Sequence, residues 1–236
     1  MIFIRLILLS AIFFLSIPTN CRTCKTFQIP QNSTEIIIEK GDITQSHVEI
    51  IVNAANEQLS GGGGVCGAIF TAAGWDKLQS ACNKYPATKN GIRCPAGEVC
   101  ITDSFNLATT GIKQIIHAVG PDCRIITNTA QQNNLLANAY KNSLLLAQQL
   151  NAQSIAFPFI SSAIYACPKK QAAHTAVKTV HEYILNYPNT SLKAIHFVLF
   201  SQEDFDLFYQ TTSKLLSTDR PTMLEKFIQY LKSYFA

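Results

Sequence analysis

Hydrophobic and polar positions along this chain follow two alternating periods. Short runs rich in Ile, Val and Phe predict β-strands, and longer runs with apolar residues three or four positions apart predict α-helices. Strands are expected at residues 34–39, 48–53, 98–102, 114–119, 154–160 and 194–200, and helices at 68–82, 133–150, 168–187 and 203–216. This alternation predicts an α/β fold with helices on both faces of a mainly parallel sheet.

The two ends of the chain have patterns of their own. Residues 1–20 combine Arg5, a short apolar run and a break at Pro18, which is typical of a secretory signal. The alternative is an uncleaved membrane anchor, although the run is shorter than the roughly 20 residues that a span needs. We expect export to a periplasm, a lumen or the extracellular space, without stable membrane insertion once the signal is removed. Residues 217–236 predict a C-terminal helix that packs on the domain.

Composition narrows the range of partners. Of the 236 residues, 47% are hydrophobic, so one domain with a single core accounts for the length. The formal net charge is +4 and basic residues form no run, so nothing indicates nucleic acid as a partner.

Export would allow the eight cysteines to form disulfides; their spacing does not reveal the pairing, and the alternative is reduced, buried thiols. Cys21 and Cys24 lack a second pair at zinc-site spacing, so we expect no metal.

The most distinctive segment runs from Asn53 to Gly67 and reads NAANEQLSGGGGVCG, between a predicted strand and a predicted helix. Each glycine costs about 1 kcal/mol relative to alanine in an ordered element, so core packing does not explain the run. Backbone N–H groups at the start of a helix bind anions, and the amides of Asn53 and Asn56 suit a sugar. The segment predicts a site for a phosphate beside a polyol. A second loop, 161–167, is expected at the same edge of the sheet.

Two familiar phosphate-binding motifs fit this segment poorly. Gly62, Gly64 and Gly67 have the spacing of the dinucleotide fingerprint, but residues 81–90, where an acidic residue is expected, contain none. A Walker loop requires Lys and Ser or Thr after its last glycine, and the sequence lacks them. A nicotinamide-dependent oxidoreductase is therefore disfavoured, and no cofactor is expected.

Five segments in sequence order resemble the macrodomain family, and within it the MacroD-type branch. They read GDIT at 41–44, NAAN at 53–56, GGGGV at 61–65, IHAVGP at 116–121 and AFPFISS at 156–162. The likeness extends from residue 34 to residue 216. It implies a three-layer α/β/α fold with a mixed, mainly parallel central sheet. It also implies ADP-ribose, or a mono-ADP-ribosylated protein, as the ligand; the oligomeric state is left open.

The resemblance assigns roles to individual residues. Asp42 would accept the adenine amino group, with a turn residue as the alternative, and Phe200 would stack on adenine, with a core residue as the alternative. Asn56 would hold the distal ribose and Tyr165 would cover it, so these two are the catalytic candidates. Asn53 is counted among the ligand residues, although it more readily braces the loop. The full set of expected ligand residues is Asp42, Ile43, Asn53, Asn56, Gly62, Gly63, Gly64, Val65, Cys66, Ser161, Ser162, Ala163, Ile164, Tyr165 and Phe200.

This chain departs from the family pattern in both loops, and Phe70 stands where relatives carry a histidine. Cys66 replaces the aspartate that orients water in relatives, and we interpret it as a small loop residue rather than a nucleophile. Ala163 and Ala166 replace glycines; if position 163 needs a positive φ, alanine there costs about 1 kcal/mol or more. His117 matches a family motif and is interpreted as structural.

Two functional hypotheses follow from these residues. The first is a hydrolase that removes ADP-ribose from acidic side chains or deacetylates O-acetyl-ADP-ribose. The second is a reader that binds ADP-ribose without turnover. The loss of the acid at position 66 and the alanines in the second loop favour the reader. Retention of Asn56, the glycine run and Tyr165 favours the hydrolase, which is the hypothesis we prefer.

Overall fold

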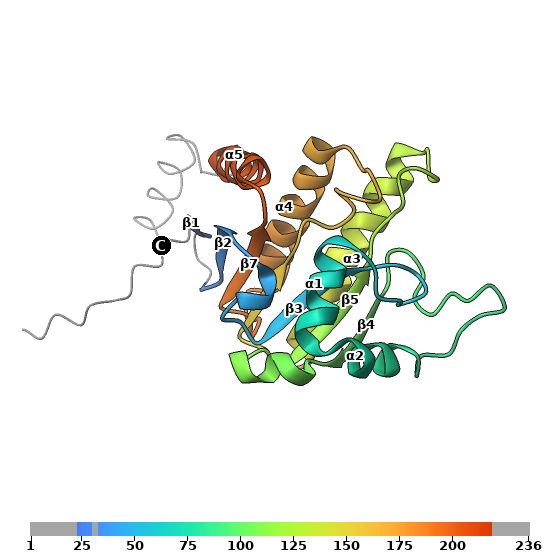
Figure 1. Cartoon of the computed structure of the whole chain (residues 1–236). Coiled ribbons are helices and arrows are strands. Elements are labelled where there is room, and N and C mark those ends of the chain that lie inside the picture. Colours follow the sequence, from blue (N-terminus) through green and yellow to red (C-terminus); the bar gives the residue numbers. More distant parts are fainter. Residues whose placement is uncertain (1–22, 30–32, 219–236) are drawn as a thin grey trace, which may run out of the picture.

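A single mixed sheet organises the chain. The computed structural model describes residues 23–29 and 33–218. Seven strands pair in the order β1-β2-β7-β6-β3-β5-β4, parallel in the centre and antiparallel at both edges (Figure 1). The strands are β1 (Cys24–Gln28), β2 (Glu35–Lys40), β3 (Ile50–Ala55), β4 (Val99–Asp103), β5 (Gln114–Val119), β6 (Ser154–Phe157) and β7 (Ala194–Leu199).

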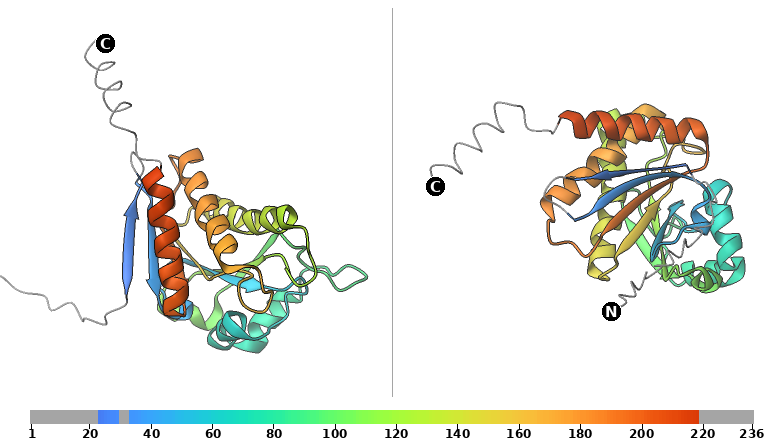
Figure 2. Two further views of the ribbon diagram at one scale, coloured as in Figure 1. Left: turned by 90° about the horizontal axis from the view of Figure 1, so that it is seen from above. Right: turned by 90° about the vertical axis from the view of Figure 1, so that its left-hand side faces the viewer.

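Helices cover both faces of this sheet. They are α1 (Gly64–Ala73), α2 (Trp75–Cys82), α3 (Thr129–Gln149), α4 (Lys169–Asn186) and α5 (Gln202–Thr218), with short 3-10 helices η1 (Ile43–Gln45) and η2 (Phe105–Thr110). Helices α3, α4 and α5 lie on one face, and α1 and α2 lie on the other (Figure 2). The prediction of a three-layer α/β/α fold with a mainly parallel sheet is confirmed.

The two faces of the sheet have separate cores. Val52, Tyr140 and Phe197 belong to the core under α3, α4 and α5, whereas Ile51 and Phe70 belong to the core under α1 and α2. Ile51 and Val52 are neighbours on β3, and successive side chains of a strand point to opposite faces. A central strand buried on both faces therefore reads as the continuous apolar run seen in the sequence.

Several element boundaries differ from the sequence prediction. The sequence did not predict strand β1, because its residues are mostly exposed and do not alternate between apolar and polar. Helix α1 begins four residues earlier than expected, at Gly64. Strand β6 ends at Phe157 rather than at residue 160, because Pro158 has no N–H to donate to the ladder. Helix α3 begins at Thr129 because the side chain of Asn128 caps it, accepting from the N–H of Gln131 at 2.9 Å.

The outer edge of the sheet at β4 is covered by a side chain. The Tyr85 hydroxyl donates to the carbonyl of Ile101 at 2.6 Å and accepts from its N–H at 2.9 Å. The outward-facing backbone groups of that strand residue are therefore both paired.

The predicted terminal segments fall outside the part of the chain that the structure describes. This applies to the signal at residues 1–20 and to the C-terminal helix, of which only residues 217 and 218 are described, within α5. Among the described helices, none combines the length and the apolar character needed to cross a bilayer.

Candidate ligand pocket

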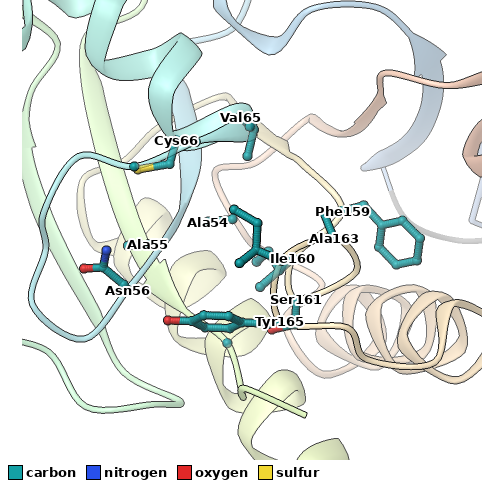
Figure 3. A pocket seen from close by; sticks show the side chains of 15 residues that line it. Ala54, Ala55, Asn56, Val65, Cys66, Phe159, Ile160, Ser161, Ala163 and Tyr165 are labelled. Atoms are coloured by element: carbon teal, nitrogen blue, oxygen red, sulfur yellow. The ribbon is translucent and has the colours of Figure 1, made fainter. Parts of the chain in front are cut away.

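A pocket of about 160 Å³ opens at the carboxyl ends of β3 and β6 (Figure 3). Ten of the predicted ligand residues line it: Asn56, Gly62, Gly63, Gly64, Val65, Cys66, Ser161, Ala163, Ile164 and Tyr165. The structure adds Ala54, Ala55, Gly120, Phe159 and Ile160, which lie within the quoted motifs but received no ligand role because they are small or apolar. The remaining predicted residues, Asp42, Ile43, Asn53, Ser162 and Phe200, are not part of its lining.

Backbone forms the wall of the pocket along the glycine run. Gly62 and Gly63 are exposed, and Gly64 has a φ of 61°, in the left-handed region that favours glycine. Gly63 caps helix α1 without any side-chain hydrogen bond, so the first N–H groups of the helix have no side-chain partner. This end of α1 is the kind of place where proteins bind phosphate groups.

A different reason requires glycine at positions 61 and 67. A Cβ on Gly67 would lie 2.5 Å from the carbonyl oxygen of Gly62, which is backbone and cannot swing away. A Cβ on Gly61 would lie 2.5 Å from Trp75 and 2.8 Å from Phe70. Gly61 and Gly67 therefore allow close packing, whereas Gly62, Gly63 and Gly64 expose backbone to the pocket.

Beneath the glycine run lies a buried polar network. The Asn53 side chain is fully buried; its Nδ2 donates to His117 Nδ1 at 3.1 Å and approaches Cys66 Sγ at 3.6 Å. This contact leaves the imidazole proton on Nε2, which lies 3.0 Å from the Thr102 hydroxyl. Burial lowers the pKa of His117 to about 4, so the ring is neutral. Asn53 thus braces the loop from below and does not line the pocket, so a ligand contact for it stays a prediction.

Cys66 lines the pocket as a neutral thiol. It lies in the first turn of α1, where a helix N-terminus favours a thiolate. Burial outweighs this effect and raises the pKa of the thiol. Its sulfur faces Asn53 and the carbonyl of Ser60 rather than a base. The interpretation of Cys66 as a small structural residue agrees with this environment.

Asn56 and Tyr165 lie on the same side of the pocket. Figure 3 shows the Tyr165 ring along one wall, with its hydroxyl on the side of Asn56. The Asn56 amide holds the loop: its Nδ2 donates to the carbonyl of Ser60 at 3.1 Å, and its Oδ1 accepts from the Ser60 N–H at 3.0 Å. Burial, together with Asp122 and Glu57, raises the pKa of Tyr165, so its hydroxyl is a neutral donor.

The second loop, residues 161–167, is strained at positions that the sequence did not indicate. Ser161 has a φ of 63° and Ala166 a φ of 52°, whereas Ala163 is not in the left-handed region. The free-energy cost of replacing a glycine by alanine therefore falls on Ala166. The sequence had suggested position 163 instead. The Ser161 hydroxyl is buried without a hydrogen-bond partner in the described part of the chain and lies against Gly120, where a Cβ would be 2.1 Å from it.

Residues 121–124 follow the end of β5 and contact the second loop. A disulfide joins Cys123 to Cys167, a pairing that could not be read from their spacing of 44 residues. Arg124 donates to both carboxylate oxygens of Asp122, at 2.9 and 2.6 Å, and lowers the pKa of that carboxyl. The guanidinium also lies 5.7 Å from the centre of the Tyr165 ring. The other described cysteines, Cys24, Cys66, Cys82, Cys94 and Cys100, are free thiols.

Asp42 and Phe200 lie further along the same edge of the sheet. They follow the adjacent strands β2 and β7, whose ends are joined by the Gly41 N–H and the Leu199 carbonyl at 2.9 Å. The Asp42 carboxylate caps η1 by accepting from the N–H and the hydroxyl of Thr44. Phe200 is 85% exposed, so the alternative that it packs in the core is wrong.

The other two predicted residues outside the pocket lining are engaged locally. Ile43 is buried in the core under α1, and the Ser162 hydroxyl donates to the Phe159 carbonyl at 2.9 Å.

Within residues 23–29 and 33–218, no group of three or more His, Cys, Asp or Glu side chains is placed to hold a metal ion.

Comparison with known proteins gives a family for this pocket. The Macro domain profile matches residues 52–176, a range that contains every residue lining the pocket. A macro domain-containing protein of Xanthomonas campestris pv. campestris is 44% identical over 179 residues, covering 71% of this chain and 97% of that protein. An O-acetyl-ADP-ribose deacetylase of Escherichia fergusonii is 42% identical over 175 residues, covering 74% and 93%.

Solved structures agree with these relatives. The Oceanobacillus iheyensis macrodomain with ADP matches with a TM-score of 0.75 at 36% identity, covering 84% of this chain and 98% of that one. The Trypanosoma brucei macrodomain in complex with ADP-ribose matches with a TM-score of 0.63 at 26% identity, covering 74% and 68%. The profile, the relatives and the solved structures agree, and the chain belongs to the Macro domain family.

Proposed function

We propose that this protein binds ADP-ribose and hydrolyses esters of its distal ribose. The observation that carries the proposal is the pocket itself, where exposed backbone at the start of α1 lies beside Asn56 and Tyr165. The substrates would be O-acetyl-ADP-ribose or ADP-ribose linked to an acidic side chain of a protein. The Escherichia fergusonii relative bears the name of the first activity, which supports that substrate class.

The proposed ligand follows the carboxyl edge of the sheet. Adenine lies near Asp42 and Phe200, beside the ends of β2 and β7. The diphosphate lies between the glycine run and the loop 161–167, where α1 presents its first N–H groups. The distal ribose lies between Asn56 and Tyr165. The strand order β2-β7-β6-β3 supports this path, because it places these groups at successive strand ends.

In the proposed reaction, water attacks the acyl carbon of the ester. The bond from that carbon to the ribose oxygen breaks, and the products are a free acid and ADP-ribose. A diphosphate oxygen of the substrate accepts a proton from the water and passes one to the ribose oxygen as the ester bond breaks, since Cys66 is a neutral thiol and supplies no base. Asn56 and Tyr165 hold the ribose, so that the ester stays in reach of the water. Orientation of this kind supplies a large share of the rate in enclosed sites.

A reader without turnover is the second candidate function, and one observation favours it. Among the residues that line the pocket, the polar side chains are Asn56, Cys66, Ser161 and Tyr165, and none is a carboxylate or an imidazole. Such a site would bind ADP-ribose through backbone groups and the ribose contacts. The ester would then persist, because no protein group orients or deprotonates water.

One experiment separates the two functions. The purified protein is incubated with a glutamate-linked mono-ADP-ribosylated protein and, separately, with O-acetyl-ADP-ribose, and release of ADP-ribose is followed. Asn56→Ala is the matched control, and calorimetry measures ADP-ribose binding on the same samples. Release that is lost in the control supports the hydrolase. Binding without release makes the protein a reader, and absence of both overturns the proposal.

We also propose that the chain is exported through residues 1–20. The Cys123–Cys167 disulfide supports this, because disulfides persist in oxidising compartments and are rare in the cytosol. The test is to express the whole chain and determine the N-terminal residue of the protein recovered outside the cytoplasm. A new N-terminus near residue 20 supports a cleaved signal. An intact Met1 in the membrane fraction indicates the anchor, and cytoplasmic retention overturns export.

A further inference from the structure

Cys123 holds the pocket loop on both sides of Ala166. Its N–H donates to the carbonyl of Tyr165 at 2.9 Å, and its sulfur is bonded to Cys167, with the two Cα atoms 5.0 Å apart. Tyr165 and Cys167 are the chain neighbours of Ala166. Residues 121–124 with this disulfide are named the Tyr165 bracket here. A single residue of the bracket thus fixes the backbone before and after Ala166.

The backbone at Ala166 is the part of the loop that needs holding. Its φ of 52° is in the left-handed region, which an alanine Cβ disfavours. Relaxation of φ to a negative value would turn Tyr165 relative to Cys167. Two hydrogen bonds within the loop resist this, from the Ala166 N–H to Ala163 and from the Cys167 N–H to Ser161, each 3.0 Å long. These bonds remain when the disulfide is broken, so the loop loses part of its support and not all of it.

The bracket also contacts the ring of Tyr165. Arg124 lies 5.7 Å from the ring centre, on a guanidinium that Asp122 holds by two hydrogen bonds. One short segment therefore contacts both the backbone and the ring of Tyr165, and its disulfide holds Cys167 two residues further on. Arg124 follows Cys123 directly in the chain, so a movement of Cys123 also displaces the guanidinium from the Tyr165 ring.

We propose that Cys123 and Cys167 are positioning residues for Tyr165, and that reduction of their disulfide weakens the binding of ADP-ribose. The inference rests on the proposed function for its ligand. In the reduction, a dithiol reductant supplies two electrons and two protons; the S–S bond breaks, two thiols form, and the reductant becomes a disulfide. The protein would then bind most tightly in an oxidising compartment.

Calorimetry with ADP-ribose tests this on the oxidised protein, on the protein reduced with dithiothreitol, and on the double variant Cys123→Ser with Cys167→Ser. Mass spectrometry of alkylated samples verifies the state of the disulfide. We expect about tenfold weaker binding after reduction, because the competent loop conformation becomes a minority. The double variant should bind as weakly as reduced protein and should not respond to dithiothreitol. Equal affinity of oxidised, reduced and double-variant protein overturns the inference.

A rescue experiment separates positioning from general stability. Ala166→Gly in the double variant removes the Cβ that disfavours the positive φ, so we expect it to recover most of the lost affinity. Ala163→Gly is the matched control, since its φ is not positive, and should recover none. Recovery by both glycines, or by neither, contradicts positioning through Ala166. If the oxidised wild type itself fails to bind ADP-ribose, the proposed function fails, and this outcome is distinct from the others.

Discussion

Asn53 and His117 share a hydrogen bond of 3.1 Å beneath the glycine run, with the asparagine amide as donor and the imidazole Nδ1 as acceptor. The bond requires a neutral ring, because a protonated imidazole has no acceptor. The loop that borders the pocket is therefore supported from below by a group whose charge state depends on pH.

The first prediction concerns acid stability. Burial lowers the pKa of His117 from its ordinary 6.5 to about 4, so the unfolded chain binds the proton first as the pH falls. The free energy of unfolding keeps this contribution above pH 6.5 and loses it between about pH 6.5 and 4, by roughly 3 kcal/mol. Urea unfolding at several pH values measures this. His117→Gln should have a shallower pH slope, whereas His174→Gln, at an exposed position, should keep the wild-type slope.

A second prediction distinguishes the two uses of glycine. Gly61→Ala should lower the free energy of unfolding by about 1–3 kcal/mol, because its Cβ overlaps Trp75 and Phe70. Gly62→Ala meets nothing within 4 Å, so its stability should stay near that of the wild type. Thermal unfolding of the two variants checks the difference. Equal melting temperatures would show that Trp75 moves aside without cost.

The alanines of the second loop give a third prediction. In the oxidised protein, Ala166→Gly should raise the free energy of unfolding by up to about 1 kcal/mol, since glycine accepts the φ of 52° freely. Ala163→Gly should lower it by about 0.5–1 kcal/mol, because there glycine only adds entropy to the unfolded chain. Denaturant unfolding gives both values. A lower stability for Ala166→Gly would argue against the left-handed conformation.

Phe200 gives a fourth prediction. Because its side chain is 85% exposed, Phe200→Ala should change the free energy of unfolding by less than about 0.5 kcal/mol. Loss of stacking on adenine should weaken ADP-ribose binding by about 1–3 kcal/mol, as measured by calorimetry. Leu185→Ala, at an exposed position on α4, is the control and should leave the affinity unchanged. Unchanged affinity of Phe200→Ala would place adenine elsewhere.

Cys66 gives the fifth prediction. Cys66→Asp puts a carboxylate at the start of α1, where the helix dipole and the Asn53 amide favour its charge. We expect ester hydrolysis to become at least about tenfold faster, since the carboxylate can orient water. Cys66→Asn has a similar shape without the charge and should not accelerate the reaction. Similar rates for both variants would mean that the substrate alone positions its water.

The central strands and the glycine run could be predicted from the sequence because each has a strong local signal. Residues 50–52 are apolar on both faces of the strand, and consecutive glycines have few structural explanations. The features that the sequence did not reveal depend on contacts between distant segments. The Cys123–Cys167 pairing needs the fold that places β5 and β6 on either side of β3, and the exposure of Phe200 depends on how β7 meets α5. The resemblance places glycine at both position 163 and position 166, and the residue pattern does not show that only position 166 takes a positive φ.

The hydrogen bonds of Tyr85 to Ile101 have a consequence for how the molecule behaves in crowded surroundings. An uncovered β4 would offer its N–H and carbonyl groups to a strand of another copy, which is a common route to aggregation. The phenol occupies both groups of Ile101, so an incoming strand must first displace it. Tyr85 therefore leaves no free backbone group at Ile101 with which a strand of another copy could pair.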